Sequence, residues 1–366
     1  MQHRVISRIN SGMFRYQAWP TVTKGQDGTL YVGCSGHRLN HICPFGKDYL
    51  YISTDEGATW TGPQIINDTL LDDRDAGLLA WGDGNLHLTW FNHHYSVYDA
   101  REKKTTAHVT LEGPVAGGMQ AYLATLPAEM IEPGSWTRIS RDNGKTWSDK
   151  RLSPVTSPHG PCLMPDGNLL YVGQLVGKDG SFKTTAPQGV ICAYISKNDG
   201  ETWEYLSELP IPEGANERKT EPHAICMANG DVLAVVRYQN MTGPSRESLR
   251  LYTAISHDFG KSCEPAEFLN LRGAPGHLLQ HSSGAVVLVY SKRCETMGEY
   301  VRVSKDYGKT WSNEKLIGPV APDWDHGYPT SVELSNGDIF TVFYQKCPGD
   351  SFNSIHGVRY SLTEIE

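Results

Sequence analysis

One short motif recurs along the chain and constrains its fold more than any other feature. The pattern S-x-D-x-G-x-T-W occurs five times, as STDEGATW (53–60), SRDNGKTW (140–147), SKNDGETW (196–203), SHDFGKSC (256–263) and SKDYGKTW (304–311). Ser, Asp and Gly favour a tight turn, and the final Trp can pack beneath a sheet. A motif that returns every 48 to 87 residues is typical of a repeat architecture. We therefore interpret the copies as structural turns.

A second repeat alternates with the first and defines the repeating unit. Six dipeptides lie between short apolar runs: Asp27-Gly28, Asp83-Gly84, Asp166-Gly167, Asn229-Gly230, Ser283-Gly284 and Asn336-Gly337. Such dipeptides predict β-hairpins. The octapeptide would then join a third strand to a fourth. Six units of four strands predict an all-β fold, the six-bladed β-propeller.

The two ends of the chain differ from the internal units. No octapeptide follows SIHGVRYSL near the C-terminus, and the N-terminal RVISRI reads as a strand without a blade. We expect the N-terminal strand to complete the last blade. One propeller domain is expected over residues 1–366, with an insertion in blade two at about 96–135.

Composition limits the partners. The chain of 366 residues has 33 basic and 41 acidic residues, a formal charge of -8, which disfavours nucleic acid or an anionic membrane. Residues 1–12 lack an apolar segment, and no stretch approaches membrane-spanning length, so we expect a soluble, cytoplasmic protein. Eight scattered cysteines without a C-x-x-C pair indicate neither disulfides nor zinc, and no metal or cofactor is expected.

Strand order locates a candidate site. Both kinds of turn lie at one end of each blade, so the start of the first strand and the end of the second meet at the other end, the mouth. The mouth collects Arg38, Arg74, Arg237, Arg293, His159 and His277. The two histidines could orient sugar hydroxyls or pack at strand ends. Several Arg beside carboxylates in one place favour a charged ligand.

The motifs and the mouth together resemble the sialidase superfamily, the Asp-box or BNR-repeat propellers, over nearly the whole chain. The segment DHGYPTSVELSNGDIFTVFY is similar to the one that carries the sialidase nucleophile, which implies Tyr328 as nucleophile. KTEPHAICMANGDVLAVVR likewise implies Glu221 as its base. A neutral phenol is repelled less than an acid by the carboxylate of sialic acid. Arg237, with Arg293 as a second member, matches the family's three-Arg carboxylate clamp.

Two positions depart from the sialidase pattern. Ala18-Trp19-Pro20 stands where sialidases have Arg-Ile-Pro, so one clamp Arg is missing unless Arg15 or Arg38 replaces it. The position of the acid/base Asp falls nearest His41, and a histidine with a reference pKa of roughly 6.5 can shuttle a proton. Asp48, or Asp73 and Asp75 in LDDRDAG, could serve instead, although the three Asp around Arg74 could equally form a salt-bridged turn.

The resemblance implies an exo-glycosidase that cleaves a terminal sialic acid or a related anionic sugar from a glycan. Two alternatives remain open at this stage. A His and Tyr pair beside Arg could act as a polysaccharide lyase on uronic-acid glycans. The lost clamp Arg and the His in place of Asp would also fit a non-catalytic propeller that binds glycans.

Overall fold

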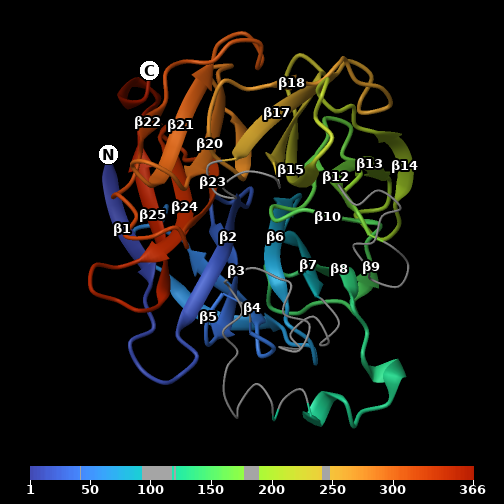
Figure 1. Ribbon diagram of the computed structural model, residues 1–366, viewed down its shortest axis with the longest axis vertical. Helices are drawn as coiled ribbons and strands as arrows, with labels where there is room; N and C mark the ends of the chain where they lie inside the picture. The colour runs from blue at the N-terminus through green and yellow to red at the C-terminus, as the bar shows by residue number, and fades with distance from the viewer. Residues whose placement is uncertain (42, 93–117, 119–120, 177–188, 241–247) are drawn as a thin grey trace.

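The protein is a six-bladed β-propeller. The computed structural model describes residues 1–41, 43–92, 118, 121–176, 189–240 and 248–366. The described strands form six separate antiparallel sheets. The first strands of neighbouring blades contact one another around the centre, and the fourth strands lie at the periphery (Figure 1). The architecture predicted from the two repeats is thus confirmed.

The blades follow one another in chain order. Blade one contains β2 (Tyr16–Lys24), β3 (Leu30–Arg38), β4 (Lys47–Ser53) and β5 (Thr61–Asn67); blade two contains β6 (Arg74–Trp81), β7 (Asn85–Asn92), β8 (Gly134–Ser140) and β9 (Arg151–Leu152). In blade three the first strand is split into β10 (Val155–Thr156) and β11 (Cys162–Leu163), which precede β12 (Leu169–Leu175), β13 (Ile191–Ser196) and β14 (Glu204–Glu208). Blade four contains β15 (Arg218–Cys226), β16 (Val232–Gln239), β17 (Leu249–Ser256) and β18 (Glu267–Phe268); blade five contains β19 (Gly276–Gln280), β20 (Val286–Lys292), β21 (Gly298–Ser304) and β22 (Lys315–Leu316). Blade six contains β23 (Gly327–Glu333), β24 (Ile339–Lys346), β25 (Asn353–Tyr360) and the N-terminal β1 (Gln2–Ser7).

The N-terminal strand closes the ring. β1 is the outermost strand of blade six and pairs antiparallel with β25, from Gln2 opposite Arg359 to Ser7 opposite Ile355. Figure 1 shows the blue β1 beside the red β25. The last blade therefore joins the two ends of the chain, as the missing sixth octapeptide predicted.

Each octapeptide forms the same turn between the third and fourth strands. In the first copy the Ser53 hydroxyl accepts the Gly57 N–H at 2.9 Å, and Asp55 accepts the Thr59 N–H at 2.8 Å. The glycine has a φ of 83°, a left-handed conformation that a side chain would disfavour. In the third copy Asn198 accepts the corresponding N–H at 2.9 Å, so an amide oxygen replaces the carboxylate without loss of the turn.

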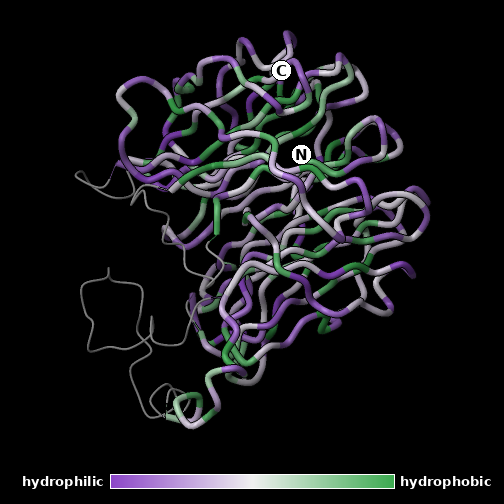
Figure 2. Tube along the Cα trace, turned by 90° about the vertical axis from the view of Figure 1, so that its right-hand side faces the viewer, coloured by the Kyte–Doolittle hydropathy of each residue, from purple (hydrophilic) through white to green (hydrophobic). Residues whose placement is uncertain are grey.

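The hydrophobic core lies between the blades. One cluster joins Leu50 of blade one to Leu78, Leu88 and Trp136 of blade two, and the other large clusters likewise combine residues of adjacent blades. Figure 2 shows hydrophobic stretches running through the interior while most turns are hydrophilic. Burial of these apolar surfaces holds the blades side by side.

The predicted insertion at 96–135 lies largely outside the described residues. Its described end contains the 3₁₀ helix η3 (Ala128–Met130), and a second, η4 (Leu362–Glu364), lies near the C-terminus. Leu123 and Ile131 pack on Leu71, which attaches this end of the segment to blade two. Among the described residues, no helix is long and apolar enough to cross a membrane.

The turns should make stability depend on acid pH. Hydrogen bonds from the Thr or Ser hydroxyl and N–H lower the pKa of Asp55, Asp142 and Asp258 to about 2. A lowered carboxyl pKa stabilises the fold above the unfolded value of about 3.9 and loses that effect as pH falls toward 2. The triple variant Asp55→Asn, Asp142→Asn, Asp258→Asn should therefore stay folded and show a weaker fall in Tm between pH 4 and 2, measured by circular dichroism. Asp149→Asn, outside the turns, serves as control; an unchanged pH dependence of the triple variant would contradict the prediction.

Candidate active site

Four blades have the same backbone irregularity, a β-bulge, at the mouth. In each, a register shift near the start of the first strand coincides with a non-glycine residue at positive φ: Trp19 (51°), Asp75 (57°), Glu221 (50°) and Tyr328 (54°). A bulge of this kind redirects a side chain that would otherwise alternate with the pleat. Such φ values are unfavourable for large side chains and cluster at functional sites. The four side chains are thus brought to the mouth by irregular backbone.

Tyr328, Glu221 and Arg237 form a hydrogen-bonded chain across blades six and four. The Tyr328 hydroxyl donates to Glu221 Oε1 at 2.9 Å, and Arg237 Nη1 donates to Glu221 Oε2 at 2.6 Å. Arg237 lies opposite Thr220 in the β15–β16 ladder, so both residues of the ion pair come from one hairpin. The geometry places a phenol next to a carboxylate that is itself held by a guanidinium.

The surroundings of Tyr328 and Glu221 shift the pKa values of these two groups in opposite directions. Burial, and then the charges of Glu221 and Asp75, raise the pKa of Tyr328 well above its usual value, so the phenol is neutral. Burial alone would raise the pKa of Glu221, but Arg237 and Arg293 reverse the shift and lower it. Glu221 is therefore ionised at neutral pH and can accept the Tyr328 proton.

A buried layer fixes the backbone of Tyr328. Its N–H donates to the Ser291 hydroxyl at 3.1 Å, and that hydroxyl donates to Glu299 at 2.9 Å. Glu299 also contacts His326 Nδ1 at 2.7 Å, and both of these side chains are fully buried. Arg293 donates to the His326 carbonyl at 2.9 Å. These contacts hold the segment in position before any ligand arrives.

Arg293 and Arg74 each lie by one ring of an aromatic floor, which is formed by Trp19 and Tyr328. The Arg293 guanidinium is 5.8 Å from the centre of the Tyr328 ring, and that of Arg74 is 4.3 Å from the centre of the Trp19 ring. The Trp19 and Tyr328 rings are 6.4 Å apart. Arg74 lies 3.8 Å from Asp72, beyond hydrogen-bond distance. Arg293 and Arg237 therefore lie beside the Tyr328–Glu221 pair, and Arg74 lies on the neighbouring Trp19 ring.

Arg38 lies beneath the mouth and not at its surface. Its side chain is fully buried and donates to both oxygens of Asp72, at 2.5 and 3.0 Å, and to the His41 carbonyl at 3.0 Å. These bonds use the guanidinium within the protein, so Arg38 supports the floor and does not replace the missing clamp Arg. Arg15, the other possible replacement, stacks on Phe352 at 4.1 Å.

The two candidate aspartates of blade two differ in their surroundings. Asp73 is fully buried and accepts hydrogen bonds from Thr69 and Asn92, as a structural residue does. Asp75 lines a cavity that it shares with Glu221, and among the described residues its Oδ1 has no hydrogen-bond partner. Burial outweighs the attraction of Arg74 and raises the pKa of Asp75 to about 7. Asp75 can thus carry a proton near neutral pH.

His41 forms a pair with an aspartate that the sequence analysis did not single out. Its Nδ1 lies 2.9 Å from Asp325 Oδ1, and the Tyr16 hydroxyl donates to Asp325 at 3.0 Å. Burial outweighs Asp325 and lowers the pKa of His41 to about 4. The hydrogen bonds in turn lower the pKa of Asp325 to about 2, against the effect of burial. At neutral pH the imidazole is therefore uncharged and its partner is ionised.

The mouth histidines His159 and His277 belong to an axial cluster with His223. His223 and His277 stack at 4.0 Å, and His159 meets His277 edge-on at 5.4 Å. His277 Nδ1 accepts the Ser331 N–H at 3.4 Å, and burial lowers the pKa of all three. These are contacts of neutral packing residues. The His159 ring lies 6.3 Å from that of Tyr328, so the cluster supports the floor from below.

Three residues of the site lay outside the sequence-based candidates. Trp19 was noted only as a departure from the sialidase pattern. Asp325 is the first residue of the segment DHGYPTSVELSNGDIFTVFY but was given no role, and Arg218 stands three residues before Glu221 on β15. A shared sequence signal was present: Trp19, Glu221 and Tyr328 each precede a proline near the start of a first strand. A proline that directly follows the residue at positive φ therefore occurs at three of the four bulges.

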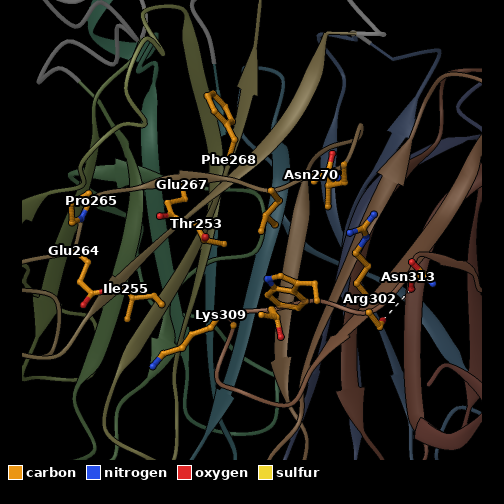
Figure 3. A pocket seen from close by; sticks show the side chains of 16 residues that line it. Thr253, Ile255, Glu264, Pro265, Glu267, Phe268, Asn270, Arg302, Lys309 and Asn313 are labelled. Atoms are coloured by element: carbon orange, nitrogen blue, oxygen red, sulfur yellow. Dashed lines mark hydrogen bonds between the residues drawn. The ribbon is translucent and has the colours of Figure 1, made fainter.

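Larger hollows occur away from the mouth. A groove of about 680 Å³ between blades four and five is lined by Glu267, Phe268, Asn270 and Arg302, among others (Figure 3). It includes residues of the fifth octapeptide, at the opposite end of the blades from Tyr328. Within the described ranges no cluster of three or more His, Cys, Asp or Glu is suited to hold a metal ion.

The fold and the repeated turns define an Asp-box β-propeller. The sequence model of the BNR repeat-like domain matches residues 125–341, more than half of the chain. The chain therefore belongs to the BNR repeat-like family, and the resemblance inferred from the octapeptides is confirmed. No curated protein matches the sequence.

Solved structures with the same fold differ in their described activities. A protein of unknown function from Dyadobacter fermentans is 20% identical with a TM-score of 0.76, and the match covers 98% of this chain and 97% of that one. An alpha-L-arabinanase from Penicillium chrysogenum is 15% identical with a TM-score of 0.68, over 100% and 99%. The NanB sialidase from Streptococcus pneumoniae is 14% identical with a TM-score of 0.68, over 99% and 71%. At these identities the likeness shows the fold alone.

The contribution of the Arg38–Asp72 ion pair to the fold can be measured as a change in the free energy of unfolding. Arg38→Met leaves Asp72 buried without its bidentate partner and should lower the free energy of unfolding by about 3–5 kcal/mol in urea denaturation. The double variant Arg38→Met, Asp72→Leu should recover much of that loss. Arg141→Met breaks an exposed pair with Asp199 at 2.8 Å and should cost about 1 kcal/mol or less. A loss for Arg38→Met no larger than for this control would remove the supporting role.

Proposed function

We propose that this propeller is a retaining exo-glycosidase that removes a terminal anionic sugar, a sialic acid or a related acid, from a glycan. The observation that carries the proposal is the 2.9 Å hydrogen bond from the Tyr328 hydroxyl to Glu221. Glu221 takes the phenolic proton as the Tyr328 oxygen attacks the anomeric carbon, the glycosidic oxygen leaves, and water later releases the sugar from the tyrosine. The arabinanase and sialidase folds among the solved structures support a glycan as ligand.

Asp75 is the proton donor in this proposal. It lines the same cavity as Glu221, and a carboxyl with a pKa of about 7 retains its proton where a usual aspartate would not. His41 has a pKa of about 4, so it carries no proton to donate at neutral pH beyond the one shared with Asp325. Two buried acids with separated pKa values, Glu221 lowered and Asp75 raised, fit a base and an acid.

The anionic group would be bound by Arg237 and Arg293, with Arg74 in place of the missing clamp residue. Arg74 reaches the floor from blade two and rests on Trp19, the residue that stands in the family's Arg-Ile-Pro segment here. Guanidinium groups bind carboxylates through paired, charge-assisted hydrogen bonds.

A second candidate is β-elimination on a uronate, and the His41–Asp325 pair favours it. Asp325 holds an uncharged imidazole, which can remove the proton next to a uronate carboxylate while the bond to the C4 oxygen breaks. The product carries a carbon–carbon double bond and absorbs in the ultraviolet, whereas hydrolysis gives no such band. Screening sialylated and uronic-acid glycans with both mass and absorbance detection separates the two reactions.

Tyr328→Phe tests the nucleophile. Removing only the attacking oxygen should abolish double-displacement turnover while ligand binding and Tm change little, because the ring still packs on Trp19. The measurement is single-turnover release of sugar from a cleaved glycan. Tyr252→Phe is the matched control, because this buried tyrosine of blade four has no hydroxyl partner within the described ranges. Wild-type rates for Tyr328→Phe would remove the mechanism.

Asp75→Asn tests the proton donor. The rate on substrates with poor leaving groups should fall by about 10²–10⁴, while activated aryl glycosides, which need little protonation, should be slowed far less. In the wild type, kcat/KM on poor leaving groups should fall as pH rises through about 7, because Asp75 then loses its proton. Asp83→Asn, in an exposed turn of the same blade, is the control. Equal slowing of both substrate types would assign Asp75 another role.

A further inference from the structure

A small cavity opens beside the catalytic pair, between blades two, three and four. It has a volume of about 170 Å³ and is lined by Asp75, Phe91, Thr156, Ser157, Pro158, Gln174, Arg218, Thr220 and Glu221. This space corresponds to roughly five or six water molecules at ~30 Å³ each. This space is large enough for a substituent of a sugar.

Arg218 is the charged group of this cavity that the protein leaves unused. It lies on β15 (Arg218–Cys226), the strand that also carries Glu221, and its side chain is exposed. Within the part of the chain that the structure describes, its guanidinium has no hydrogen bond or ion pair. Arg237, by contrast, is bound to Glu221, and Arg38 is bound to Asp72.

The other polar groups of the cavity are also free to meet a ligand. Asp75 is 6% exposed, and no residue that the structure describes forms a hydrogen bond with its Oδ1. Thr156 and Thr220 add hydroxyl groups, and Gln174 adds an amide. A nearly buried polar atom without a partner is costly unless a ligand or water satisfies it. Phe91 and Pro158 supply an apolar wall, as in a ligand site with a few directed polar groups.

The charge of the cavity favours an anion. Glu221 and Arg237 neutralise each other, and Asp75 carries a proton over part of the neutral range. While Asp75 is protonated, Arg218 therefore leaves an excess of one positive charge in the cavity. A planar guanidinium suits a carboxylate or a sulfate, each of which can accept two parallel hydrogen bonds.

We propose that this cavity binds an anionic substituent, a carboxylate or a sulfate, that the sugar carries away from its anomeric carbon, with Arg218 as its partner. The proposal rests on the proposed function, because it takes Tyr328 and Glu221 as the position of the anomeric carbon. It narrows the substrate to a sugar that carries a second anionic group, a carboxylate or a sulfate, besides the group that Arg74, Arg237 and Arg293 would bind. Arg218 is a specificity-determining residue in this scheme.

Isothermal titration calorimetry tests the subsite without turnover. The probes are free glucuronate, galacturonate and galactose 6-sulfate, each compared with neutral glucose or galactose. The wild type should bind at least one acid more tightly than its neutral parent. Arg218→Gln should weaken that acid by roughly ten- to hundredfold, the usual worth of a charge-assisted hydrogen bond, and leave the neutral sugar unchanged. Arg218→Lys should retain part of the preference for the acid. Preferred binding of a uronate would indicate a carboxylate subsite, and preferred binding of galactose 6-sulfate would indicate a sulfate subsite.

Arg272→Gln, an exposed arginine outside the cavity, is the matched control and should leave the preference intact. The subsite is refuted if no acid binds better than its neutral parent, or if Arg218→Gln weakens acid and neutral sugar equally. This failure differs from failure of the proposed function, which is decided by turnover of Tyr328→Phe. A propeller that keeps the Arg218-dependent preference but shows no turnover would retain the subsite and lose the mechanism.

Discussion

The pairing of β1 with β25 is the constraint on which the site depends. It joins the first strand of the chain to the third strand of the last blade, so the six sheets form a closed ring. Trp19 of blade one and Tyr328 of blade six meet at 6.4 Å only because that ring is closed. Antiparallel backbone hydrogen bonds give this closure without covalent links. The geometry of the mouth therefore depends on the β1–β25 pairing at the outer edge of blade six.

Charge is distributed in two layers around the mouth. In the lower layer, buried charged groups are matched within the protein, as in Arg38 with Asp72. In the upper layer, Arg74 lies 3.8 Å from Asp72, and within the described part of the chain Arg218 has no ion pair and Asp75 Oδ1 has no hydrogen-bond partner. A buried charge without a partner is strongly destabilising, and in the lower layer the pairing of Arg38 with Asp72 meets this requirement within the protein. A polar ligand could supply the partners that the upper layer lacks.

The fold could be predicted from the sequence because it depends on short-range interactions. The whole site could not be predicted, because it depends on contacts between residues that are far apart in the sequence. The octapeptides and the D-G or N-G turns act through short-range hydrogen bonds, so they predicted the blades and the closing strand. Tyr328, Glu221 and Arg237 were located by resemblance, and the structure places them in contact. Arg38 was expected at the surface of the mouth, but the depth of a strand-end side chain depends on Asp72, 34 residues away. Asp325 was missed because its partner His41 lies 284 residues away in the sequence.

The bulges in the first strands allow each of four blades to contribute one side chain to the mouth separately. Each of four blades presents one side chain from an irregular backbone position: an indole, a carboxyl, a second carboxyl and a phenol. The sheet on either side of each bulge keeps its register independently of what the neighbouring blades present. A substitution at one of these positions would therefore change the chemistry that one blade presents at the mouth and leave the other three side chains as they are. In this chain Trp19 stands in the segment where sialidases have Arg-Ile-Pro.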